Sequence, residues 1–278
     1  MRSNYHTHTH FCDGKENMRF FVEKAIELQF EHLGFSPHAP ISNHYDFTIT
    51  EDEIPTYLKE VADYQKKYPQ ISIFKGMECD YVPGITKDFA YYKNKYDLDY
   101  IIGGVHLVKV PNRDDIWFID GPKREIYDEG LKNFFNNNIQ KAVTCFWEQT
   151  FEMIETQQFD IIAHVDKIKM HNRHRFFQED EAWYLKLVNH AIHLIVNKGL
   201  IVEINSRGLY RLRCDSFYPS DYMLEKLAKA HVPFVISSDA HKAEELALYY
   251  EEAKIKLQHF GIKTVSILEN KKWHPYLM

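Results

Sequence analysis

The sequence lacks the features of a secreted protein or a protein that spans a membrane. Only four cysteines occur in 278 residues, and no two of them form a Cys-x-x-Cys pair. This scarcity argues against a disulfide framework and a thiolate zinc site, and it favours a reducing compartment. No apolar run approaches the roughly 18 residues that a membrane span requires, so we expect no membrane partner.

An excess of basic residues is also missing. The chain has 34 Lys and Arg against 40 Asp and Glu, which gives a formal net charge of -6. Because no global basic surface is expected, the composition disfavours nucleic acid as a partner. A histidine-rich run begins at His6 and leaves no room for a signal peptide. These observations predict a cytoplasmic protein whose partner is a small molecule.

Histidine, by contrast, is abundant, with 16 copies. The opening run Tyr5–Gly14 contains His6, His8, His10 and Asp13. Side chains two apart on a strand share a face, so His6 and His8 can converge on one ion. Imidazole suits Zn, Mn, Fe or Ni. A tag remnant would be a histidine homopolymer, whereas threonines alternate with the histidines here, so the run predicts a metal site.

Short apolar runs alternate with amphipathic segments along the whole chain, and no linker interrupts them. We expect strands at 32–36, 71–77, 100–105, 160–163, 200–204, 233–237 and 263–268, with helices between them that include 18–31, 140–156, 181–198 and 243–259. Repeated strand–helix units imply a parallel sheet, and a closed or nearly closed barrel accommodates seven or eight of them. The predicted fold is an α/β barrel in one domain, 1–278, with irregular insertion loops near 109–138 and 171–179.

Nearly every predicted strand ends in a possible metal ligand, at the end of a barrel where active sites are built. The donors are His6, His8, Asp13, His38, Glu78, His106, His164, Asp239 and His241. Nine donors are too many for one ion, so they imply two or three metals, with Glu78 or Asp239 able to bridge. Any one histidine could be structural, Asp239 could cap a helix, and Asp13 could be a turn residue. Six histidines at successive strand ends are far harder to explain by chance.

Clustered divalent metals suit phosphate esters, because they neutralise the oxyanion and generate hydroxide at neutral pH. We hypothesise that a hydroxide bridging two metals, held by Glu78, Asp239 and His106, attacks phosphorus in line. Basic side chains should hold the phosphate. Arg207 is the first choice, because its fork fits phosphate, and Lys169 is the second; either could instead be a surface residue.

The nine donors resemble the four motifs of the polymerase-and-histidinol-phosphatase (PHP) superfamily over the whole chain. The resemblance implies a distorted (β/α)7 barrel of the PHP type and a trinuclear centre of Zn, Mn or Fe. The implied sites are His6, His8, Glu78 and Asp239 for one metal, Glu78, His106 and His164 for a second, and Asp13, His38 and His241 for a third.

Three segments are similar to the monofunctional histidinol-phosphatase branch, namely 5–14, 36–40 and 117–121. Asp13 stands where the superfamily often has histidine, a variant associated with that branch. The implied reaction is hydrolysis of L-histidinol phosphate to L-histidinol and phosphate in histidine biosynthesis. This substrate also carries an ammonium and an imidazole, so Asp120 and Trp117 are expected to contact it. His10 either faces the substrate or is solvated.

Two alternatives remain at this stage. A phosphoesterase or nuclease of the same superfamily would act on nucleotides or nucleic acid, but the acidic balance disfavours it. A non-catalytic metal-binding scaffold would be expected to have lost ligands, and all nine donors are present.

Overall fold

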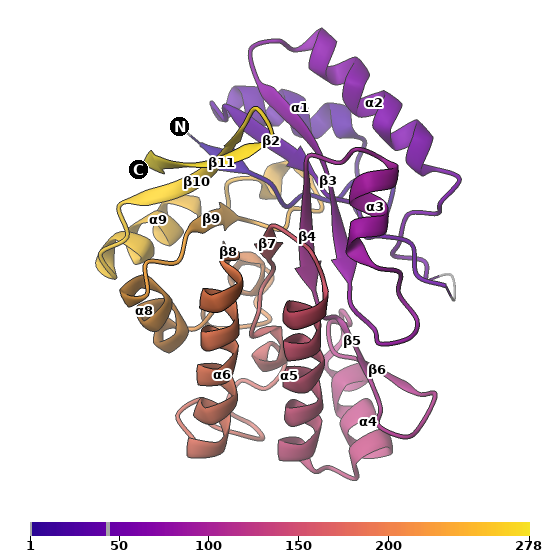
Figure 1. Cartoon of the computed structure of the whole chain (residues 1–278), viewed down its shortest axis with the longest axis vertical. Helices are drawn as coiled ribbons and strands as arrows, with labels where there is room; N and C mark the ends of the chain where they lie inside the picture. The colour runs from indigo at the N-terminus through magenta and orange to yellow at the C-terminus, as the bar shows by residue number, and fades with distance from the viewer. Residues whose placement is uncertain (1, 43–44) are drawn as a thin grey trace.

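The computed structural model describes residues 2–42 and 45–278. Seven parallel strands form one sheet in the order β1-β2-β3-β4-β7-β8-β9 (Figure 1). Their bounds are Ser3–Asn4, His32–Phe35, Ser72–Asp80, Tyr100–Gly104, Ile161–Ile162, Ile201–Asn205 and Phe234–Ser237. The sheet curls until its two edges meet, where the backbone N–H of His8 donates to the carbonyl of Ala240 at 2.8 Å. This nearly closed α/β barrel confirms the predicted fold class.

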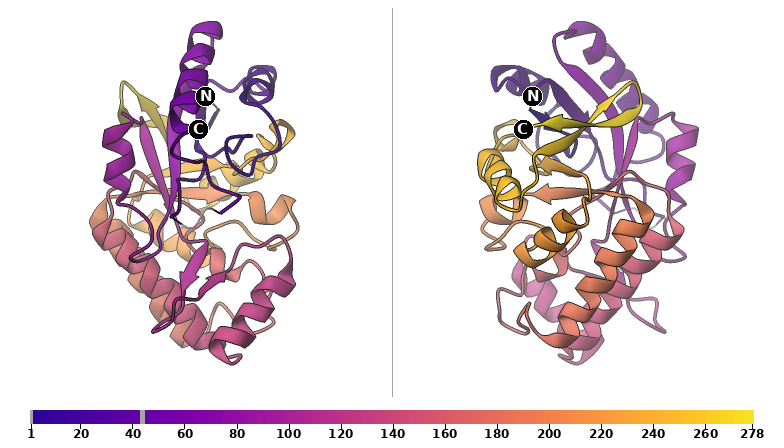
Figure 2. Two further views of the ribbon diagram at one scale, coloured as in Figure 1. Left: turned by 90° about the vertical axis from the view of Figure 1, so that its right-hand side faces the viewer. Right: turned by 60° about the vertical axis from the view of Figure 1, so that its left-hand side comes forward.

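Helices cover the outside of the barrel, and Figure 2 shows α5 and α6 side by side. The main helices are α1 (Met18–Glu27), α2 (Ile54–Lys67), α3 (Phe89–Lys95), α5 (Ile139–Thr156), α6 (Ala182–Lys198), α8 (Asp221–Lys229) and α9 (Tyr250–His259). The inner face of α1 carries Met18, Phe21, Val22 and Ala25, the spacing expected of an amphipathic helix. Helix α6 ends at Gly199, whose left-handed φ of 69° suits glycine.

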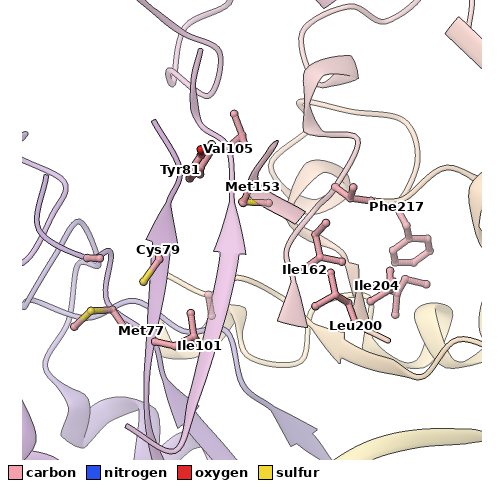
Figure 3. Packing of buried hydrophobic residues seen from close by; sticks show 14 of the residues in the cluster. Met77, Cys79, Tyr81, Ile101, Val105, Met153, Ile162, Leu200, Ile204 and Phe217 are labelled. Atoms are coloured by element: carbon pink, nitrogen blue, oxygen red, sulfur yellow. The ribbon is translucent and has the colours of Figure 1, made fainter. Parts of the chain in front are cut away.

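Strand alternation separates the hydrophobic core from the barrel interior. On β3, Met77 and Cys79 belong to the hydrophobic core outside the barrel, which Figure 3 shows at close range. Glu78 and Asp80 alternate with them, so these two carboxylates point the other way, into the barrel. The same strand therefore anchors the core with one face and presents polar groups with the other.

The prediction of an irregular loop at 109–138 is wrong in part, because the segment contains regular secondary structure. A hairpin of β5 (Leu107–Lys109) and β6 (Ile116–Phe118) leads into helix α4 (Arg124–Phe135). Trp117 holds this unit together: it is fully buried, and its indole Nε1 donates to the carbonyl of Tyr127 at 3.1 Å. Each strand is only three residues long, and the surrounding sequence is rich in proline and glycine. Sequence periodicity therefore did not predict these strands. The other predicted insertion, 171–179, contains neither helix nor strand.

The C-terminal region also differs from the prediction. The expected closing strand is β10 (Thr264–Glu269), but it pairs antiparallel with β11 (Lys272–Leu277) and lies outside the seven-stranded sheet. The helix expected at 243–259 is divided into the short turn η2 (Ala243–Glu245) and α9. Two further short helical turns are η1 (Lys167–Lys169) and α7 (Arg207–Tyr210). Among the described residues, no helix combines the length and apolar character of a membrane span.

Gln149 on α5 ties Tyr81, which follows β3, to strand β5. Its amide nitrogen donates to the carbonyls of Tyr81 and Leu107 at 2.5 and 2.7 Å, and its oxygen accepts from the Lys109 N–H at 2.9 Å. We predict that Gln149→Leu lowers the free energy of unfolding by about 1–3 kcal/mol, because buried main-chain groups lose their partners. Urea denaturation measures this. Gln140→Leu, at an exposed position of the same helix, should change stability far less, and equal losses would contradict this account.

Candidate metal centre

The nine predicted donors gather at the C-terminal ends of the barrel strands. Eight of them are buried, and the side chain of Asp13 is about one-third exposed. Six of the nine line a cavity of about 730 Å³, namely Asp13, His38, Glu78, His106, Asp239 and His241. The side chains of His6, His8 and His164 lie beneath it, in contact with Glu78.

A first cluster forms where the two histidines of the opening run meet two carboxylates. His6 Nε2 and His8 Nε2 are 3.0 Å apart, and Glu78 Oε2 lies 3.1 and 3.2 Å from them. Asp239 Oδ1 completes the group at 3.7 and 3.3 Å. His6 Nδ1 donates to Glu203 Oε2 at 2.6 Å, which leaves a lone pair on Nε2. This lone pair therefore points at other electron-rich atoms.

A second cluster uses the other oxygen of Glu78. His164 Nε2 lies 3.0 Å from Glu78 Oε1 and 3.1 Å from His106 Nε2. His106 Nδ1 donates to Asp80 Oδ1 at 2.5 Å, so its Nε2 also carries a lone pair. Because its two oxygens face different clusters, Glu78 has the geometry of a bridging ligand.

A third cluster lies beside the first. His241 Nε2 is 2.9 Å from Asp13 Oδ2, and His241 Nδ1 donates to the backbone carbonyl of Asp239 at 3.0 Å. The ligand atoms of His8, Asp13 and His38 all lie within 4.8 Å of one another. The resemblance placed Asp13, His38 and His241 together; all three line the cavity, and Asp13 lies close to each of the two histidines.

The residues present fit metal ions. Glu78 Oε2 and Asp13 Oδ1 are buried without a hydrogen-bond partner. Burial alone would raise the pKa of Glu78, but His6, His38 and His106 in their protonated form hold it well below its usual value. Metal ions in place of these protons would supply the same positive charge. Converging lone pairs and buried carboxylates repel one another unless protons on the imidazoles or metal ions between them supply positive charge. Imidazole nitrogen with carboxylate oxygen is a donor set that suits Zn, Mn or Fe.

Cationic side chains line the cavity beside these clusters; they are Lys15, Lys167, Arg207, Arg211, Arg213 and Lys242. Lys167 Nζ lies 2.7 Å from Asp120 Oδ2, and Arg207 donates to the Asp239 carbonyl at 2.7 Å. Burial alone would lower the pKa of Lys167, but Asp120, Asp239 and Glu78 keep it above its usual value. The cavity thus combines buried carboxylates with a charged wall, which suits an anionic ligand that also contacts metals.

Of the predicted substrate contacts, Arg207 and Asp120 line the cavity. Lys169 does not: its Nζ is buried against the Phe217 carbonyl and Asp166 Oδ2, both at 3.0 Å. The short turn η1 directs Lys167 to the cavity and turns Lys169 into the interior, which sequence spacing did not indicate. The prediction that Lys169 lies at the site is therefore wrong, and Lys167 lines the cavity instead.

Two other predicted contacts also lie elsewhere. Trp117 is buried inside the β5–β6 unit, and its neighbour Phe118, on the opposite face of the strand, lines the cavity. His10, expected either to face the substrate or to be solvated, is exposed and lines a neighbouring pocket. The choice of Trp117 treated 109–138 as a loop, whereas strand β6 places Trp117 and Phe118 on opposite faces.

Two buried carboxylates behind the histidines escaped the sequence analysis. Asp80 contacts His106 and His38, and Glu203 contacts His6. The sequence contains a feature that could have marked each of them as a residue of the site. Asp80 follows Glu78 by two positions, so it shares its face, and Glu203 is flanked in β8 by the apolar residues Val202 and Ile204.

Comparisons with known proteins agree with this architecture. The model of the PHP domain family matches residues 4–207. The histidinol-phosphatase of Bacillus subtilis is 23% identical over 270 residues, which cover 88% of this chain and 96% of the relative.

Solved structures are similar over most of their length. A candidate histidinol phosphatase HisK from Listeria monocytogenes has a TM-score of 0.80 and 23% identity, covering 90% of this chain and 99% of that one. Histidinol phosphate phosphatase from Lactococcus lactis, solved with Zn, L-histidinol and phosphate, has a TM-score of 0.68 and 18% identity, covering 98% of both chains. At these identities the likeness establishes the fold.

We predict that a chelator lowers the midpoint of thermal unfolding by about 5 °C or more, because metal binding stabilises only the folded chain. Differential scanning calorimetry of chelated and reconstituted protein measures the shift. Zn or Mn should restore the midpoint, whereas Ca, which prefers oxygen ligands, should not. The same midpoint with and without chelator would contradict a metal centre.

Proposed function

The chain belongs to the PHP domain family, and on this premise we propose that it is a metal-dependent phosphomonoesterase that hydrolyses L-histidinol phosphate in histidine biosynthesis. The observation that carries the proposal is the position of Glu78, whose two oxygens face separate histidine clusters beneath a cationic wall. The Bacillus subtilis relative named histidinol-phosphatase and the Lactococcus lactis structure with histidinol and phosphate support this choice of substrate.

We propose that the three clusters hold two or three divalent metals, with Zn, Mn and Fe as the candidates. His6, His8, Glu78 and Asp239 would hold one metal, Glu78, His106 and His164 a second, and Asp13, His38 and His241 a third. When bound, such metals supply an activated water at neutral pH and neutralise the phosphate oxygens. The shared carboxylate Glu78 would keep the first two sites close enough to act on one phosphate group.

The phosphate group would be held by the cationic wall. Lys167 and Arg213 already flank Asp120, at 2.7 and 3.9 Å, so their charges are oriented toward the cavity before a ligand arrives. Arg207 is fixed by Tyr210 Oη at 3.1 Å and by the Asp239 carbonyl. Charge-assisted hydrogen bonds from such preoriented donors are roughly twice as strong as neutral ones.

The histidinol portion needs an aromatic wall and a carboxylate. Phe47 and Phe118 line the cavity and lie nearly parallel, with an interplanar angle of 7° and ring centroids 5.8 Å apart. We infer that the imidazole of the substrate packs on this pair and that Asp46, which also lines the cavity, faces its ammonium group. The four free cysteines, three of them buried, support the cytoplasmic location that we also propose.

A substrate panel tests the function. Protein reconstituted with Mn, Fe or Zn should release phosphate from histidinol phosphate with a higher kcat/KM than from p-nitrophenyl phosphate, nucleotides or single-stranded DNA. Higher efficiency on nucleotides or DNA would instead favour a PHP phosphoesterase or nuclease. Efficient hydrolysis of another phosphomonoester without activity on histidinol phosphate would rule out the proposed substrate.

Lys167 provides a sharper test of phosphate recognition. We predict that Lys167→Met lowers kcat/KM for histidinol phosphate about 10–100-fold, because a charge-assisted hydrogen bond contributes about 1.5–3 kcal/mol. Steady-state kinetics at saturating metal measure the effect. Lys141→Met, at an exposed position of α5, is the matched control and should leave kcat/KM unchanged. Wild-type kinetics in Lys167→Met would show that this ammonium group does not contact the substrate.

A further inference from the structure

Asp80 lies behind the metal centre and contacts histidines of two different clusters. Its Oδ1 is 2.5 Å from His106 Nδ1, and its Oδ2 is 3.1 Å from His38 Nδ1. The Asp80 side chain is fully buried. One carboxylate therefore uses each of its oxygens on a different imidazole, and these imidazoles belong to the second and the third cluster.

Each of these contacts decides which ring nitrogen is free to bind a metal. A neutral imidazole has one N–H and one lone pair, so an Nδ1–H that donates to a carboxylate leaves the lone pair on Nε2. Glu78 Oε2 lies 3.3 Å from His38 Nδ1, but it is nearer to His6 Nε2 and His8 Nε2, in the first cluster. Asp80 is thus the carboxylate placed to hold the Nδ1 protons of both His38 and His106.

Glu203 has the same role at a single histidine. Its Oε2 accepts from His6 Nδ1 at 2.6 Å, and its Oε1 accepts from the side-chain amide of Asn205. The amide oxygen of Asn205 in turn accepts from the Arg207 N–H at 2.8 Å, so the orientation of this amide is fixed. Within the described residues, Glu203 contacts a histidine of the first cluster alone, which makes it a natural comparison for Asp80.

We propose that Asp80 is a positioning residue that serves two metal sites at once, by fixing the Nε2-ligating form of His106 in one and of His38 in the other. Glu203 serves one site, through His6. This inference rests on the proposed metal centre and deepens it, because it predicts that two of the ions respond together to a single carboxylate. Removal of a carboxylate behind a ligating histidine typically weakens metal binding 10–100-fold.

Three substitutions test whether Asp80 supports two metal sites and Glu203 only one. Asp80→Ala removes both acceptors and should weaken two ions, whereas Glu203→Ala removes a carboxylate of similar burial and should weaken one. Asp80→Asn keeps the shape but replaces one of the two acceptor oxygens with an NH2 donor group. The ring that faces the donor must accept through Nδ1 and carry its proton on Nε2, so Asp80→Asn should weaken one of the two ions and spare the other.

The measurement is a count of bound metal during titration of the full chain with Co²⁺. Visible absorption reports each ion as it binds, and a competing chelator gives its affinity. The role of Asp80 requires an ion at both the second and the third site, so the wild type should bind three ions, and a wild type that binds only two would overturn this role. Asp80→Ala should hold two of them about 10–100-fold more weakly, and Asp80→Asn and Glu203→Ala should each weaken one. Circular dichroism of the metal-free proteins should be the same for all four chains.

The outcomes separate this inference from the proposed function. A wild-type chain that binds fewer than two ions, or binds them without hydrolysing histidinol phosphate, contradicts the proposed enzyme. A functional wild type together with an Asp80→Ala chain that weakens one ion or none overturns the role of Asp80. If Asp80→Ala does not fold, Asp80→Asn decides: wild-type affinity at every site would overturn the inference.

Discussion

Repulsion between electron-rich atoms in a buried space is the constraint on which the rest of this structure depends. Nε2 of His6 and of His8 lie 3.0 Å apart, and Glu78 Oε2 is within 3.2 Å of both. These groups repel one another unless protons on the imidazoles or metal ions compensate them. The donor set fits divalent metals, and the proposed phosphatase chemistry uses the same charge to bind and activate a phosphate ester.

The barrel makes this arrangement possible through one strand in particular. On β3, Met77 and Cys79 are buried in the hydrophobic core, while Glu78 and Asp80 face the barrel interior. Glu78 contacts the metal-facing nitrogens of two clusters, and Asp80 contacts the opposite nitrogens of two histidines. A shift of this strand by one residue would exchange the two faces, so core packing and site geometry are specified together.

Much of the site could be predicted because its donors stand at strand ends. Parallel strands bring their C-terminal ends to one face, so His38, His106 and His164 converge even though they are far apart in sequence. The nine-residue set was found in this way. Carboxylates behind the ligands were missed because a polar residue within a strand, such as Glu203, gives no signal of its partner until the neighbouring strands are in place.

Segments outside the barrel strands were harder to predict. The β5–β6 hairpin has strands of only three residues, and it owes its order to the burial of Trp117 against α4. Its orientation decides that Phe118, not Trp117, lines the cavity. In the same way, the short turn η1 decides that Lys167 reaches the cavity while Lys169 is buried. Both outcomes depend on tertiary contacts that sequence periodicity does not encode.

The central claim is that metal ions compensate the buried donors, and crystallographic anomalous scattering tests it most directly. Diffraction data collected at the absorption edge of the reconstituting metal should show peaks between His6 and His8, between His106 and His164, and between Asp13 and His241. Each peak should lie about 2.0–2.2 Å from imidazole nitrogen and carboxylate oxygen. Reconstituted crystals without an anomalous peak beside Glu78 would contradict the account.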